Sequence, residues 1–335
     1  MSETTPPVPR LIEVEYQPLE PVYTAPVRHQ RYWLHILLIL LTVFTTLMVG
    51  TQLEHNFQQG LPIFTLGDGL IPLFPIKFVM QQPSRLLMGI PFSFTLLTIL
   101  LAHEMGHYIY CLRYNVYATL PFFIPAPTLI GTMGAFIRIK SPIRSRTALF
   151  DIGIAGPIAG FVVAFFVMLF SLMMSRPMPP GVGQGDIVLG FPLIFRFAYW
   201  LIMGGGMPGM SLENTLLHPT AVAAWVGMFA TALNLLPGGQ LDGGHIVYSI
   251  FPRAHRHVSR LTVGALLPMG LFLWPGWLVW ALLLTISGMR HPVVTPWPEP
   301  SYRRRLLAVV ALIMLIITVT PVPFPGAAFQ FPHWK

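Results

Sequence analysis

Hydrophobic residues are grouped along this chain in long blocks, and five of these blocks approach the length of a membrane-spanning helix. A helix needs about 20 apolar residues to cross a bilayer. The five blocks cover residues 32–51, 92–112, 150–174, 219–236 and 306–320. The pattern therefore predicts an all-α polytopic membrane protein.

Two further apolar stretches are interrupted. Residues 61–80 contain three prolines and two glycines, which favours a re-entrant or interfacial segment over a straight span. Residues 261–286 are broken by "WPGW", so they form either one kinked span or two short helices in a hairpin. With these stretches the chain has about six to seven membrane segments.

The basic residues give an orientation. With the N-terminus inside, the successive crossings leave only five of the 20 Lys and Arg residues outside, as the positive-inside rule expects. This arrangement favours the hairpin for residues 261–286 and places the C-terminus outside. We expect a disordered cytosolic tail (1–31), a first helix with the re-entrant or interfacial segment (32–85), a core (86–250) and C-terminal transmembrane segments (251–335).

Composition agrees with a membrane protein and excludes one other class. Hydrophobic residues make up 54% of the chain and charged residues 10%, about half or less of the charge of a soluble domain. The net charge of +8 comes from basic residues that flank apolar blocks. It therefore predicts no nucleic-acid surface, which would need clustered basic and aromatic residues.

Candidate chemistry lies inside the second block, "LLTILLAHEMGHYIYCLRY". His103 and His107 stand four residues apart, so on a helix they share one face and can bind a metal, while Glu104 can activate water. Zinc suits such a site when a third protein ligand is present. Ionisable residues within a spanning segment are rare and usually functional.

The third ligand has few candidates, because the chain has only 12 acidic residues. After the motif, the predicted inner side holds Asp151, Asp242 and Glu299. Asp151 opens an apolar run, where an N-cap role is sufficient, and Glu299 lies in a proline-rich loop. Asp242 follows a span directly in "NLLPGGQLDGGH", whose glycines and proline present it on irregular backbone. It is the best candidate, with Asp151 as the alternative.

The two motifs together resemble the site-2 protease family of intramembrane zinc metalloproteases. The resemblance spans residues 86–250, which it implies to be the catalytic core. The residues that match it are His103, Glu104, His107, Asn234, Pro237, Leu241, Asp242 and Gly243. It implies that two histidines and Asp242 bind Zn²⁺, and that Glu104 is the general base and passes the proton to the leaving amine. Asn234 is implied to contact the substrate or the developing oxyanion; its alternative role is to bond backbone near a broken helix.

The resemblance also implies a short membrane-associated β-hairpin beside the active site. Residues 132–137 match it, with Thr132, Met133 and Gly134 as candidate substrate-binding residues, and an exposed strand edge there could pair with an unwound substrate. Packing alone explains the glycines at 153, 156 and 160. We expect His245 to be a solvated loop histidine, with a role beside the metal as the alternative.

The leading hypothesis is a hydrolase for regulated intramembrane proteolysis, a zinc endopeptidase that cleaves transmembrane segments of other proteins near the cytosolic face. The alternatives are a metal transporter or sensor, or a non-catalytic relative that binds membrane proteins. Expected partners are a transmembrane protein substrate and membrane lipid, with an adaptor protein as one route to substrate selection. We place the chain in a bacterial plasma membrane, with an organelle membrane as the alternative.

Overall fold

The structure is a computed structural model that describes residues 32–65, 74–179, 181–183, 185–203, 211–288, 291–292, 294–295 and 298–327. The predicted tail, residues 1–31, lies outside the described residues, as do residues 66–73 of the predicted re-entrant or interfacial segment.

Within the described part, three helices are long and apolar enough to cross a membrane. They are α1 (Tyr32–Gln58), the continuous run Pro83–Arg113, which consists of the 3₁₀ turn η1 (Pro83–Gly89) and α3 (Ile90–Arg113), and α4 (Arg146–Met174). They contain the first three blocks predicted as spans. The membrane protein class therefore rests on these three helices.

The remaining elements are shorter. They are α2 (Ile76–Gln81), α5 (Leu193–Ile202), η2 (Leu212–Asn214), α6 (Pro219–Asn234), α7 (Asp242–Ile250), α8 (His255–Phe272), α9 (Gly276–Ile286) and α10 (Tyr302–Thr318). The predicted number of six to seven membrane segments is not confirmed. One reason is that α6 ends at Asn234 after 16 residues, which is about 24 Å of helix against a hydrocarbon core of about 30 Å. Residues 261–286 form two helices, α8 and α9, that pack against each other, as the hairpin alternative predicts.

Two short strands pair where the sequence predicts the hairpin. β1 (Phe122–Pro125) and β2 (Thr132–Phe136) run antiparallel, with Phe123 opposite Ala135. Gly131 has a φ of +76° and packs so tightly on α1 that an added Cβ would lie 2.6 Å from a backbone oxygen of Thr45. Association of this hairpin with the membrane stays a prediction. A second pair, β3 (Arg176–Pro177) with β4 (Thr215–Leu216), lies at the far end of α4.

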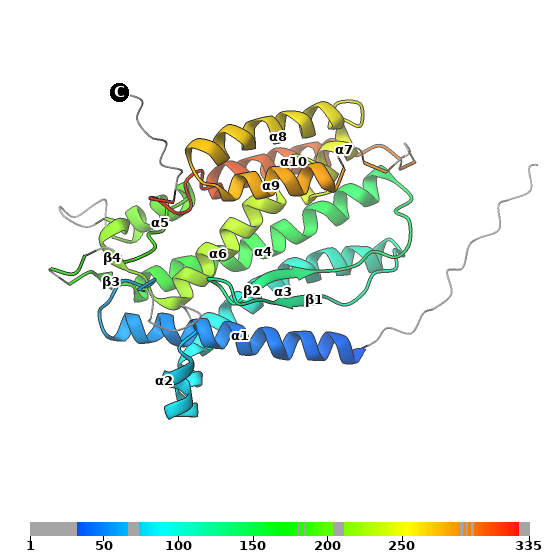
Figure 1. The fold of residues 1–335 in the computed structure, drawn as a ribbon. Helices are drawn as coiled ribbons and strands as arrows, with labels where there is room; N and C mark the ends of the chain where they lie inside the picture. Colours follow the sequence, from blue (N-terminus) through cyan, green and yellow to red (C-terminus); the bar gives the residue numbers. More distant parts are fainter. Residues whose placement is uncertain are drawn as a thin grey trace, which may run out of the picture. The chain divides into compact units, whose positions relative to one another are not determined.

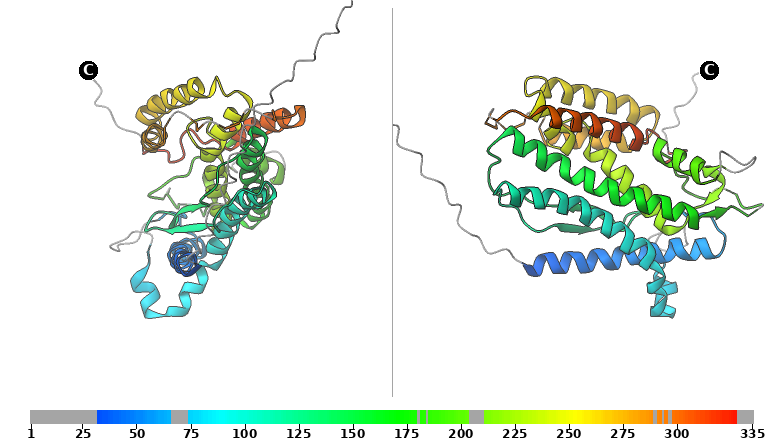
Figure 2. Two further views of the ribbon diagram at one scale, coloured as in Figure 1. Left: turned by 90° about the vertical axis from the view of Figure 1, so that its right-hand side faces the viewer. Right: turned by 180° about the vertical axis from the view of Figure 1, so that it is seen from behind.

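Helices α3 and α4 lie side by side and form the centre of the fold (Figures 1 and 2). On one side α1 packs on α3, and on the other α6, α7 and α10 pack on α4. The helices approach closely because Gly106 faces α4, where an added Cβ would lie 2.5 Å from the backbone oxygen of Ala155. The motif on α3 is therefore held directly against α4.

The start of α4 corrects one prediction. The helix begins at Arg146 and its N-cap is Ser145, whose hydroxyl accepts a hydrogen bond from the Ala148 N–H at 3.1 Å. Asp151 therefore lies inside the helix and does not cap it. Its carboxylate accepts two hydrogen bonds from Arg304 of α10, at 2.7 and 2.8 Å, and a third from the hydroxyl of Tyr114 at the end of α3.

Candidate metal centre

The two histidines of α3 point into the protein together, as their spacing predicts. His103, Glu104 and His107 are all buried, each with 7% of its surface exposed. The Nε2 atoms of the two imidazoles lie 3.2 Å apart. Two lone-pair donors this close repel each other unless a proton or a cation lies between them, so the arrangement suits a metal ion.

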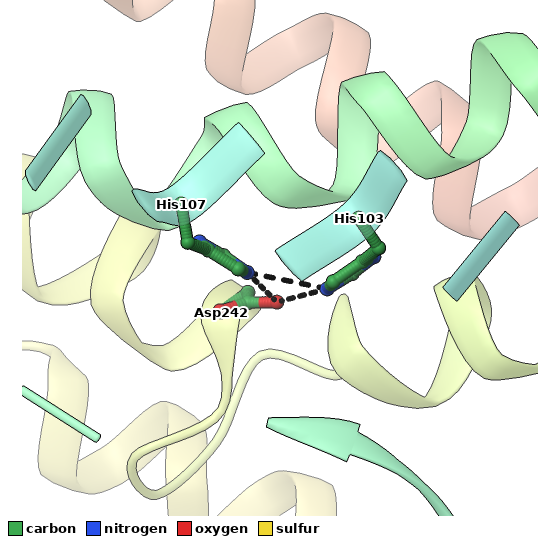
Figure 3. A group of neighbouring side chains, drawn as sticks. All are labelled: His103, His107 and Asp242. Carbon is green, nitrogen blue, oxygen red and sulfur yellow. Dashed lines mark hydrogen bonds and ion pairs between the residues drawn. The ribbon is translucent and has the colours of Figure 1, made fainter. Parts of the chain in front are cut away.

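Asp242 reaches the histidines from a segment more than 130 residues later in the chain (Figure 3). After α6 the backbone turns irregularly through residues 235–241, and Asp242 is the first residue of α7. Its Oδ2 lies 3.3 Å from Nε2 of both His103 and His107. The turn is tight: a Cβ on Gly243 would lie 2.1 Å from a backbone oxygen of Leu235, so only glycine fits there.

The three ligand atoms fit the geometry of zinc. With zinc–ligand bonds of about 2.0 Å, the ligand atoms of a tetrahedral site are separated by about 3.3 Å. The observed separations are 3.2, 3.3 and 3.3 Å. The Nδ1 of His107 lies 2.7 Å from the Ile152 carbonyl oxygen, which can only accept, so Nδ1 carries the proton and Nε2 presents a lone pair. Among the described residues, this is the group of three histidine, cysteine or acidic side chains that could hold a metal.

Two glycines of α4, predicted to serve helix packing alone, lie directly against the two histidines of the site. A Cβ on Gly156 would lie 2.1 Å from Nε2 of His107, and a Cβ on Gly160 would lie 3.1 Å from Nδ1 of His103. The two glycines are four residues apart, as the two histidines are. This shared spacing is the feature of the sequence that could have predicted the contact. These glycines therefore leave the space that the two imidazole rings occupy.

The side chains predicted to bind substrate share one cavity with part of the site. A cavity of about 460 Å³ is lined by His103, Glu104 and Asn234 and also by Thr132, Met133 and Gly134 of β2. The side chain of Met133 is 68% exposed, whereas the Thr132 hydroxyl is buried and donates to the Ile124 carbonyl at 2.8 Å. A peptide in this cavity would lie between the general-base candidate and the strand edge.

Asn234 is the last residue of α6, and its side chain contacts His103. Its Nδ2 lies 3.2 Å from Nε2 of His103. The side chain is thus directed at the site. The alternative role would need a contact with backbone at the helix end, whereas this contact is with a histidine side chain.

The expectation for His245 is wrong. This residue lies within α7, partly buried, with its Cβ 3.0 Å from the position that a Cβ on Gly153 would take. Its Nδ1 lies 2.8 Å from Nε2 of His291, which is stacked on Tyr248. Burial lowers the pKa of His245 to about 4, so the side chain is neutral at physiological pH. The sequence could not show this, because His291 is far away along the chain.

Comparison with known proteins agrees with the geometry. The model of peptidase family M50 matches residues 91–274, more than half of the chain. Among curated proteins, the chain is 28% identical to "Probable zinc metalloprotease EGY1, chloroplastic" of Oryza sativa subsp. japonica over 304 residues, 87% of this chain and 50% of that protein.

Two Arabidopsis thaliana proteins share the same sequence identity with the chain. The chain is 28% identical to the EGY1 protein of that plant over 309 residues, 87% of this chain and 53% of the relative. It is 28% identical to "Probable zinc metalloprotease EGY2, chloroplastic" over 247 residues, 70% of this chain and 42% of the relative. The chain spans about half the length of these curated relatives.

Proposed function

Because the chain belongs to peptidase family M50, the site-2 protease family, we propose that it is a zinc-dependent endopeptidase that hydrolyses peptide bonds in transmembrane segments of membrane proteins. The observation that carries this proposal is the meeting of His103, His107 and Asp242 within 3.3 Å of one another, beside a buried Glu104 that lines a cavity. The names of the relatives, which describe zinc metalloproteases, support it.

The roles follow from the positions of the side chains. His103, His107 and Asp242 hold the zinc, which when bound makes water more acidic and polarises the scissile carbonyl. Glu104 takes the proton from the attacking water and delivers it to the leaving amine, because it lines the cavity that receives the peptide. Asn234, 3.2 Å from Nε2 of His103, is placed to donate a hydrogen bond to the developing oxyanion.

A helical substrate must unwind before it can be cut, because a carbonyl inside a helix is hydrogen-bonded and covered by the next turn. Thr132, Met133 and Gly134 on β2 line the cavity, so an unwound segment can lie along this strand. The Thr132 hydroxyl is bonded to Ile124 within the hairpin, so its contribution to substrate binding is through the backbone.

Several predictions about the setting enter the proposal unchanged. We place the catalytic core at residues 86–250 and the site near the cytosolic face, with membrane lipid around it and an adaptor protein as one route to substrate selection. A bacterial plasma membrane and an organelle membrane are the two candidate locations. The word "chloroplastic" in the names of the relatives supports the organelle alternative.

The test compares three purified proteins in detergent: native, Glu104→Gln and Asp242→Ala. Metal content is measured by mass spectrometry, and cleavage is measured with a reporter transmembrane substrate. We expect the native protein to hold about one zinc and to cut, Glu104→Gln to keep zinc without cutting, and Asp242→Ala to lose zinc. A Glu104→Gln protein that cuts at the native rate, or a native protein that binds zinc and transports it without cutting, contradicts the proposal.

A further inference from the structure

The cavity beside Glu104 has a second kind of lining, which the catalytic roles do not use. Apart from its polar residues, its walls include five aromatic side chains: Trp280 of α9 and a group of four, Trp225, Phe229, Trp274 and Phe324. We call these four the aromatic wall. The four come from α6, from the turn between α8 and α9, and from the chain after α10. Segments far apart in the sequence thus build one aromatic wall.

The aromatic wall is a closed ring of contacts. The ring centroid of Trp225 lies 5.4 Å from that of Phe229 and 5.7 Å from that of Phe324. Trp274 completes the circuit, with its centroid 5.9 Å from Phe229 and 5.6 Å from Phe324. Each side chain is thereby held by two others, at separations that favour aromatic pairs. The wall is a preformed surface for apolar groups.

Three polar groups of the cavity lining donate hydrogen bonds within the protein. The hydroxyl of Thr231 donates to the Gly227 carbonyl at 2.8 Å, and that of Thr128 donates to the Thr132 carbonyl at 3.1 Å. The indole N–H of Trp225 donates to the Gly190 carbonyl at 2.7 Å. A charged side chain packed against the four rings would lose its water and meet no oppositely charged group among them, whereas an apolar side chain would gain burial.

The cavity is large enough for more than one small side chain. Its volume of about 460 Å³ lies within the range of about 300–1,000 Å³ typical of ligand sites. Met133 and Gly134 of β2 line it as well, and successive side chains of an extended peptide along a strand point to opposite sides. One side chain of a bound segment would therefore face the wall while the backbone stays at Glu104.

From this we infer that the cavity is a recognition pocket for a large apolar side chain, such as Leu, Phe or Trp, close to the bond that is cut. The inference rests on the proposed function and adds a substrate class to it. Substrates are transmembrane segments that carry a bulky apolar residue at one fixed position relative to the cut.

The experiment varies the substrate and the pocket together. A reporter transmembrane peptide is prepared with Ala, Leu, Trp or Lys at each position near the cut, and kcat/KM is measured for the full chain in detergent. Ala230→Leu fills the pocket and Trp280→Ala widens it, since both residues line the cavity. The matched control is Phe170→Ala on α4, whose side chain is 73% exposed and lies away from the cavity lining. Binding of the uncut peptides to Glu104→Gln is measured in parallel.

We expect one position at which Leu or Trp raises kcat/KM at least about tenfold over Ala and Lys lowers it further. Ala230→Leu should move the preference toward Ala, Trp280→Ala should move it toward Trp, and Phe170→Ala should leave it unchanged. Zinc content and thermal midpoint show whether each variant is folded, and either pocket variant alone is a sufficient test.

The outcomes separate the inference from the function on which it rests. Cleavage with no side-chain preference, or a preference that is the same in the native protein and in a folded pocket variant, overturns the pocket and keeps the protease. Peptides that bind to Glu104→Gln with the expected preference, but that the native zinc-loaded protein does not cut, keep the pocket and reject the protease.

Discussion

Replacing Gly156 with alanine tests how closely α4 must approach the paired histidines. The new Cβ would lie 2.1 Å from Nε2 of His107, whereas ordinary contact begins at 3.4 Å. The imidazole, or the helix that carries it, must therefore move by at least about 1.3 Å, more than half the length of a zinc–nitrogen bond of about 2.0 Å. A displacement of this size removes His107 from the position that completes the site.

We expect Gly156→Ala to weaken zinc binding by at least about 10- to 100-fold and to lower kcat/KM by about 100-fold. Gly160→Ala is the graded comparison, because its Cβ would lie 3.1 Å from Nδ1 of His103, a contact that a shift of a few tenths of an ångström relieves. Gly264→Ala on α8 is the control, since its Cβ would meet nothing within 4 Å.

The assay is zinc affinity by competition with a chelator, together with cleavage of the reporter substrate and the thermal midpoint. Gly264→Ala should keep zinc affinity and gain up to about 1 kcal/mol in stability from the higher helix propensity of alanine. A Gly156→Ala protein whose zinc affinity stays within twofold of native would refute the reasoning. Equal losses in Gly156→Ala and Gly160→Ala would refute the grading by distance.

Three further predictions concern the frame around the site. Asp151→Asn removes the carboxylate that accepts two hydrogen bonds from Arg304. The free energy of unfolding, measured by thermal denaturation, should therefore fall by about 1–3 kcal/mol. Native stability in this variant would contradict a role for the pair. Ser145→Ala removes the N-cap of α4 and should lower the free energy of unfolding by about 1 kcal/mol in the same assay, whereas Ser145→Thr should lower it less. Equal losses in the two variants would argue against capping. Burial lowers the pKa of His245 from 6.5 to about 4, so between these pH values the unfolded chain binds a proton that the folded chain does not. Stability should therefore fall as pH falls through this window, by up to about 1.4 kcal/mol per pH unit, and His245→Gln should reduce the slope; an unchanged slope would contradict the assignment.

The chemistry of the site was accessible from the sequence for two physical reasons. Helix periodicity places His103 and His107 on one face, whatever the rest of the fold does. The scarcity of acidic residues in an apolar chain then reduced the candidates for a third ligand to a few, of which Asp242 is the one that lies beside the histidines. Both arguments depend on local sequence or on composition.

The parts that sequence reasoning missed depend on contacts between distant segments. The apolar run that begins at Asp151 predicts a cap there, but the helix starts earlier, at the N-cap Ser145, and Arg304 of α10 bonds the Asp151 carboxylate. His245 looked like a loop residue because "DGGH" is rich in glycine, yet those glycines open a helix. The predicted number of membrane segments stays unconfirmed, and α6 shows one reason. Hydropathy does not show where a helix ends, and α6 stops at Asn234 while the apolar run continues to residue 236.

The position of Asp242 on a separate helix has a consequence for how the protein matures. More than 130 residues separate it from His107, and they include all of α4 and α6. A chain growing from its N-terminus therefore has the histidines and Glu104 long before the third ligand is synthesised. With Asp242 as that ligand, zinc loading becomes a late step of biogenesis. Until that step the nascent chain lacks one of the three side chains that could hold the metal.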